Sequence, residues 1–92
     1  MANAVVTAKI MPESPEVDME GLQAAVIGKI KGFAGEGDTR TAIEPVAFGL
    51  QALKVTFVMD ENLGSPDALE APITGLDGVS SFEVVDVRRA IG

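Results

Sequence analysis

Cysteine and histidine are absent from this sequence of 92 residues, and aromatic side chains are scarce, with four phenylalanines and no tryptophan or tyrosine. The absence of thiols and imidazoles excludes disulfide bonds, cysteine or histidine nucleophiles, and metal sites built on sulfur or imidazole ligands. The core must therefore be packed from Val, Ile, Leu, Ala and Met. A chain without cysteine is compatible with a reducing cytoplasm, where we expect the protein to be located.

Positive charge is also in short supply, since seven Lys and Arg residues face fourteen Asp and Glu residues and the formal net charge is −7. This balance disfavours nucleic acid and anionic membrane surfaces as partners, because both require a dense basic surface. The first residues lack the basic segment and apolar run of a signal peptide, and no stretch has the length of a membrane-spanning helix. The length fits one domain, which we expect to occupy residues 1–92.

Two segments have the apolar spacing and the end signals of helices. Residues 18–31 begin with Asp18 as a candidate N-cap, carry apolar side chains three and four residues apart, and meet Gly32 as a candidate C-terminal stop. A second helix is predicted to start at Pro66, where a serine N-cap precedes a proline at the first helical position. Pro72 interrupts its apolar stripe, so this helix is expected to be short or kinked.

Four segments alternate apolar and polar residues as half-buried strands do: residues 4–11, 39–46, 51–59 and 79–88. Pro45 near the end of the second segment predicts an edge strand, because proline has no N–H to offer a neighbouring strand. In the fourth segment the apolar parity slips by one residue after Val84. This slip predicts a β-bulge or a strand buried on both faces.

The resulting order, β-α-β-β-α-β, is that of the α+β ferredoxin-like plait, a four-stranded antiparallel sheet with two helices on one face. Nine apolar residues are expected to form the core between sheet and helices: Val6, Ile10, Leu22, Val26, Leu53, Val55, Phe57, Leu69 and Ile73. The other face of the sheet is left open. There we expect Lys9 to lie beside Lys54, with Glu44 or Asp86 close enough to offset the repulsion.

The plait serves many functions, so the fold alone decides none of them. Metal chaperones and iron–sulfur proteins of this shape need cysteine ligands and are excluded. RNA-recognition domains need exposed aromatic residues on the central strands, whereas Phe57 is predicted to point toward the helices. Acidic residues gather around the start of the first helix: Glu13, Glu16, Asp18 and Glu20. They follow one loop and one helical turn, so we interpret them as a solvated face that complements the helix dipole and not as a metal site.

Three segments are distinctive enough to carry a family resemblance: Lys9–Asp18 (KIMPESPEVD), Glu44–Lys54 (EPVAFGLQALK) and Val84–Arg89 (VVDVRR). Together they resemble the archaeal elongation factor 1-beta family, and the resemblance runs over essentially the whole chain. It implies a guanine nucleotide exchange factor that promotes GDP release and GTP loading on the GTPase elongation factor 1-alpha during translation elongation. Such a factor is not an enzyme and needs no cofactor or metal of its own, and we expect it to be a monomer when free.

The resemblance also implies which residues bind the partner: Ala47, Phe48, Gly49, Leu50, Arg88 and Arg89. In the family, the Phe of the Phe-Gly hairpin inserts into a pocket on the GTPase. The C-terminal end of the last strand, here Arg88 to Gly92, approaches the nucleotide and its Mg²⁺. Eukaryotic relatives end in a lysine that intrudes on the Mg²⁺ site. This chain ends in alanine, isoleucine and glycine, which leaves Arg88 and Arg89 as the candidate cations.

Two questions stay open at the level of the sequence. Phe48, followed by a glycine at a predicted hairpin tip, either folds back to cap the core or stays exposed to anchor a partner.

The alternative function is a small-ligand-binding regulatory plait of ACT type, which binds amino acids at a dimer interface. An acylphosphatase-type enzyme is disfavoured, because the segment 11–14 supplies an acid where a phosphate-binding loop needs hydrogen-bond donors.

Overall fold

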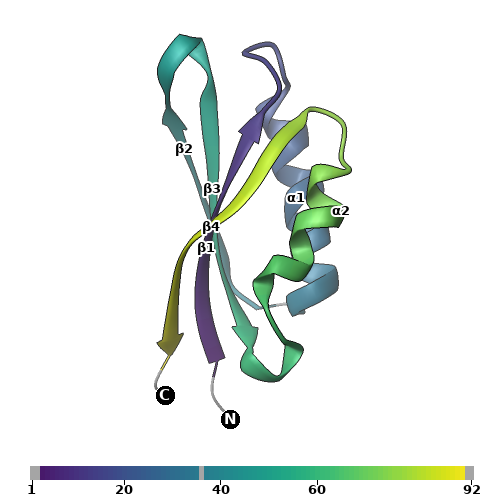
Figure 1. The fold of residues 1–92 in the computed structure, drawn as a ribbon, viewed down its shortest axis with the longest axis vertical. Helices are drawn as coiled ribbons and strands as arrows, with labels where there is room; N and C mark the ends of the chain where they lie inside the picture. Colours follow the sequence, from purple (N-terminus) through teal and green to yellow (C-terminus); the bar gives the residue numbers. More distant parts are fainter. Residues whose placement is uncertain (1–2, 36, 91–92) are drawn as a thin grey trace.

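Four antiparallel strands form one sheet, and the helices cover one of its faces (Figure 1). The computed structural model describes residues 3–35 and 37–90. Its strands and α-helices are β1 (Asn3–Pro12), α1 (Met19–Ala34), β2 (Thr39–Pro45), β3 (Gln51–Asp60), α2 (Glu70–Thr74) and β4 (Val79–Ala90). The strand order is β2-β3-β1-β4, and each neighbouring pair is antiparallel. This order confirms the predicted ferredoxin-like plait, with β2 at an edge as Pro45 indicated.

The core lies between the sheet and the helices because side chains along the central strands alternate between the two faces. In β1 the even-numbered residues from Ala4 to Pro12 are buried, whereas the odd-numbered residues from Val5 to Met11 are half-buried. Strand β3 repeats the pattern with the opposite numbering, so that its odd-numbered residues from Leu53 to Met59 are buried. All nine predicted core residues are at most 5% exposed, which confirms the predicted core.

Helix α1 begins where the sequence predicted and ends later. The Asp18 carboxylate caps it by accepting a hydrogen bond of 3.2 Å from the backbone N–H of Glu20. Gly32 does not stop the helix, which continues to Ala34 because Phe33 and Ala34 still pack against the core. The helix ends at Gly35, whose φ of +88° is readily adopted only by glycine. The prediction of a stop at Gly32 was therefore wrong by about one turn.

The second helical segment is short, as Pro72 predicted. A 3₁₀ turn, η3 (Pro66–Leu69), leads into α2, which has only five residues. The Ser65 hydroxyl caps the turn by accepting a hydrogen bond from the N–H of Asp67. Leu69 and Ile73 are nevertheless fully buried, so the segment still covers its part of the sheet. In the described part of the chain, no helix combines the length and apolar character needed to cross a membrane.

Strand β4 contains the predicted bulge. Thr7 of β1 lies opposite Asp86 but the next residue, Ala8, lies opposite Val84, so that Val85 has no partner across the ladder. The extra residue shifts the phase of everything after it. Arg89 consequently lies opposite the buried Ala4, on the helix side of the sheet.

The open face of the sheet carries polar cross-strand pairs between β1 and β3. Lys9 lies opposite Lys54 and Thr7 opposite Thr56, with 3.2 Å between the two threonine hydroxyls. The Lys54 ammonium is 3.1 Å from the Glu44 carboxylate, which offsets the repulsion between the lysines. These contacts confirm the predicted arrangement of the open face.

We expect Phe57→Ala to lower the free energy of unfolding by about 3–5 kcal/mol, because it removes a ring that is 1% exposed in the core. Phe48→Ala removes the same atoms from a ring that is 94% exposed, so its loss should stay within about 0.5 kcal/mol. Urea denaturation of both variants measures the difference. Equally small losses for the two substitutions would contradict the placement of Phe57 in the core, and equally large losses would contradict the exposure of Phe48.

Candidate functional site

The tip of the β2–β3 hairpin presents an aromatic ring to solvent. A 3₁₀ turn, η1 (Ala47–Gly49), connects the strands and is closed by a 2.8 Å hydrogen bond from the N–H of Val46 to the carbonyl oxygen of Leu50. Phe48 in this turn is 94% exposed, more than any other large apolar side chain in the described chain. The ring does not fold back onto the sheet, which removes the interpretation of Phe48 as a core cap.

The backbone at the tip adopts an unfavourable conformation at Phe48. Phe48 has φ of +64° and ψ of +28°, and it is the only residue other than glycine with positive φ within residues 3–35 and 37–90. The left-handed conformation is unfavourable by about 1–2 kcal/mol for a residue with a Cβ atom. Gly49 follows with φ of +75°, and the N–H of Leu50 bonds back to Ala47 at 3.3 Å. Strain of this kind persists where the surrounding structure enforces it, and it is concentrated at functional sites.

A second distinctive segment lies beside this tip. A Cβ atom added to Gly49 would be 3.9 Å from Cγ of Pro15, so the loop between β1 and α1 passes close to the hairpin (Figure 1). That loop is anchored on its other side, where the N–H of Glu13 donates a 2.8 Å hydrogen bond to the carbonyl oxygen of Gly78. Two of the segments that carry the family resemblance therefore meet at one end of the molecule.

Four acidic residues surround the start of α1. Glu13, Glu16, Asp18 and Glu20 are all exposed, and Asp18 serves as the cap of α1. Across the described residues, no three Asp or Glu side chains converge in a way that would hold a metal ion.

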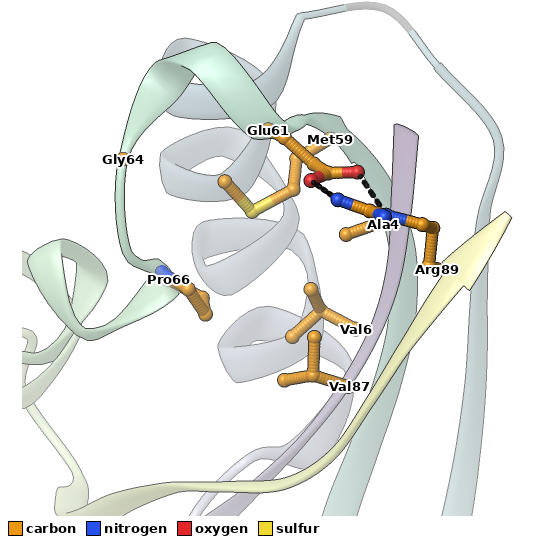
Figure 2. A pocket seen from close by; sticks show the side chains of 8 residues that line it. All are labelled: Ala4, Val6, Met59, Glu61, Gly64, Pro66, Val87 and Arg89. Carbon is orange, nitrogen blue, oxygen red and sulfur yellow. Dashed lines mark hydrogen bonds and ion pairs between the residues drawn. The ribbon is translucent and has the colours of Figure 1, made fainter. Parts of the chain in front are cut away.

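The two predicted arginines belong to the last part of β4, which ends at the opposite end of the sheet from the hairpin tip (Figure 1). They lie opposite Val5 and Ala4, which places them on opposite faces of the sheet. Arg88 is on the open face, where its Nε lies 2.9 Å from the Asp86 carboxylate two residues earlier. Arg89 is on the helix side and donates two hydrogen bonds to Glu61, of 2.9 Å from Nε and 2.8 Å from Nη2 (Figure 2). The predicted binding residues thus form two separate groups. Ile91 and Gly92 lie outside the described residues.

Glu61 is a residue that sequence analysis did not single out. It belongs to a 3₁₀ turn directly after β3, η2 (Glu61–Leu63), and its side chain is 33% exposed. With Arg89 it borders a hollow of about 260 Å³ whose remaining lining is apolar: Ala4, Val6, Met59, Gly64, Pro66 and Val87 (Figure 2). The two residues are 28 positions apart and lie on different elements, so the periodicity within one helix or strand could not have indicated the pair.

The ion pair shifts the titration of both partners. Hydrogen bonds from Arg89 lower the pKa of the Glu61 carboxyl below its usual value, and the charge of Arg89 acts in the same direction. The same hydrogen bonds raise the pKa of Arg89.

Residues 5–90 match the family model described as the EF-1 guanine nucleotide exchange domain. The chain belongs to this family. It is 44% identical to elongation factor 1-beta of Methanothermobacter thermautotrophicus over 97% of this chain and 98% of that protein. It is also 40% identical to elongation factor 1-beta of Methanosphaera stadtmanae, with 97% of this chain and 98% of that protein covered.

Membership of the family gives the chain a role in guanine nucleotide exchange during translation elongation, and its relatives are archaeal. A solved structure of LarC2, the C-terminal domain of a cyclometallase, aligns with a TM-score of 0.63 over 99% of this chain and 58% of that one. At 16% identity this likeness shows a shared fold alone. The alternative of an ACT-type regulatory plait receives no support from any of these relatives.

We expect Phe48→Gly to leave the free energy of unfolding unchanged or to raise it by up to about 1.6 kcal/mol. Glycine removes a left-handed penalty of about 1–2 kcal/mol, and the greater entropy of the unfolded chain offsets about 0.4–1 kcal/mol of that gain. Urea denaturation against wild type measures the change. A clear destabilisation would mean that the Phe48 ring makes stabilising contacts.

We also expect the Glu61 carboxyl to titrate below its usual pKa in the folded protein and to return to that value in Arg89→Gln. Because the folded pKa is the lower one, the contribution of this carboxyl to stability is complete above the unfolded pKa and is lost as pH falls through the folded pKa. An NMR titration of the Glu61 side chain in the wild-type protein and in Arg89→Gln measures its folded-state pKa in each. Identical titration in the two proteins would mean that the ion pair does not persist in solution.

Proposed function

We propose that this protein is the guanine nucleotide exchange factor of elongation factor 1-alpha, and that it promotes release of GDP and loading of GTP. The observation that carries this proposal is Phe48, an aromatic residue that is 94% exposed in a turn with left-handed backbone, in a chain of the exchange family. A large apolar side chain kept in water at a hairpin tip is suited to fill a pocket on another protein. We place the activity in the cytoplasm and expect the free factor to be a monomer that acts as one domain.

The mechanism is differential binding and involves no covalent chemistry, so the factor is not an enzyme in the usual sense and needs no cofactor. It binds the nucleotide-free GTPase more tightly than the nucleotide-bound GTPase, and by linkage it lowers nucleotide affinity by the same factor. GTP at high concentration then displaces the factor by mass action.

The magnitudes show how much the tip can contribute. A thousandfold faster release of GDP requires a barrier lower by about 4 kcal/mol. Burial of one phenylalanine contributes about 1.5–3 kcal/mol. Only the share of this burial energy that is gained in the nucleotide-free complex and not in the nucleotide-bound complex accelerates GDP release. A second contact is therefore required. Arg88 and Arg89 at the other end of the sheet are our candidates for the region that supplies it.

The two groups lie near opposite ends of a molecule that is 42 Å long and about half as wide. If both contact one GTPase, the partner extends along the long axis of the sheet. The short tip segment Ala47–Leu50 supplies one contact, and the end of β4 supplies the other.

We expect wild-type protein to accelerate the release of a fluorescent GDP analogue from the GTPase, and Phe48→Ala to reduce this acceleration at least tenfold. The tenfold estimate corresponds to about 1.4 kcal/mol, which is below the burial energy of the ring. Stopped-flow fluorescence with elongation factor 1-alpha from the same organism measures the rate.

Phe57→Ala is the control, because it lowers stability without altering the tip. Assayed at a temperature where it stays folded, it should retain the wild-type rate. Wild-type activity in a folded Phe48→Ala variant would refute the anchor role, and no acceleration by wild-type protein would refute the proposed function itself.

A further inference from the structure

The last residues of β4 are poorly held by packing. Strand β4 is an edge strand that hydrogen-bonds to β1 alone, and past the bulge it runs away from α1 and α2 (Figure 1). Its first half contributes Val79 and Phe82 to the core, at 4% and 7% exposure. In its second half Val87 is 53% exposed, and the Arg88 and Arg89 side chains are 80% and 70% exposed. Edge segments with few buried contacts open at low free energy.

The Glu61–Arg89 pair ties this segment to the rest of the sheet. Arg89 lies opposite Ala4 in β1, and Ala4 lies opposite Met59 in β3, two residues before Glu61. The ion pair therefore spans three strands, and the small Ala4 side chain leaves room for it (Figure 2). Two parallel bonds to one carboxylate fix the guanidinium in orientation as well as in position.

Glu61 is the better-fixed partner of the pair. Its side chain is less than half as exposed as that of Arg89. The turn η2 that carries it is capped by the Asp60 carboxylate, which accepts a 2.8 Å hydrogen bond from the N–H of Asn62. An anchored carboxylate thus holds a strand end that has little packing of its own.

The neighbouring Arg88, in contrast to Arg89, forms an ion pair that does not link β4 to another strand. It lies opposite Val5 on the open face, and its bond to Asp86 joins two residues of the same strand. Such a bond cannot restrain β4 relative to β1 or β3. The two adjacent arginines are therefore suited to different tasks, one facing outward and one holding the strand.

We propose that Glu61 is a positioning residue of the exchange factor, which acts through Arg89 to hold the end of β4 in the conformation that meets the GTPase. This inference rests on the proposed function. Arg89 is in this account a tether and not a contact to the partner. Loss of the tether lowers the fraction of free factor that is ready to bind, and the apparent affinity falls by that fraction.

The test compares Glu61→Gln, Arg89→Gln and the charge-reversed double variant Glu61→Arg/Arg89→Glu, with Arg88→Gln as the matched control. An exposed ion pair contributes little to global stability, so all four variants should fold. In the free protein, hydrogen exchange of the amides of residues 86–90 should accelerate in the two single Glu61 and Arg89 variants. It should return toward wild type in the double variant and stay unchanged in Arg88→Gln.

In the GDP-release assay, the concentration of factor that gives half-maximal acceleration should rise roughly two- to fivefold in Glu61→Gln and Arg89→Gln, with the maximal rate retained. The double variant should recover most of the loss. One pattern would overturn the proposal and make Arg89 a direct contact. In that pattern, Arg89→Gln weakens the apparent affinity, the double variant does not restore it, and Glu61→Gln keeps the wild-type affinity. Unchanged amide exchange in Glu61→Gln would overturn it as well. Amide exchange tests the tether even if wild-type protein fails to release GDP, an outcome that would refute the proposed function separately.

Discussion

The register between the central strands β1 and β3 is the constraint on which the rest of this structure depends. Eight consecutive residue pairs, from Asn3 opposite Asp60 to Ile10 opposite Leu53, fix which side chains face the helices. A slip by one residue would exchange Val6 and Ile10 for neighbours such as Lys9 and would place a charge in the core. The same register sets the ends of the molecule. It brings the hairpin tip to the end where β1 leads into its loop, and Glu61 to the end where β4 finishes.

The parts of this fold that could be predicted from the sequence are those set by a pattern of residues close together in the chain. Alternation along β3, the stripe of α1 and the effect of Pro72 each depend on residues within one turn or one strand. The bulge was predictable for the same reason, because a change of parity after Val84 is visible locally. The helix end was not, since Gly32 tolerates a helical conformation and the packing of Phe33 decides the outcome. Propensity is a weak signal wherever tertiary packing opposes it.

The candidate site shows a similar division. The exposure of Phe48 was one of two alternatives that the sequence left open, because a hairpin tip allows the ring to point either way. Its left-handed backbone conformation is not encoded by the residue type and arises from closure of the turn between Val46 and Leu50. The proximity of Pro15 to Gly49 and the pairing of Glu61 with Arg89 depend on the three-dimensional path of the chain. Contacts between distant segments carry no periodic signal in a single sequence.

In the exchange role proposed above, the protein acts by binding alone and must keep its binding groups available. This requirement would explain why both ends depart from the rules that govern the core. Phe48 forgoes about 1.5–3 kcal/mol of burial and bears about 1–2 kcal/mol of backbone strain in the free protein. Burial of the Phe48 ring against a partner would recover the burial energy. Because one hydrogen-bonded sheet joins the two ends, engagement of one end by the GTPase would place the other within reach of its own contact, and the second binding step would be effectively intramolecular. That advantage is greatest when neither end must be ordered on binding. A closed turn fixes Phe48 at one end, and the Glu61–Arg89 ion pair fixes the other, where packing is weakest.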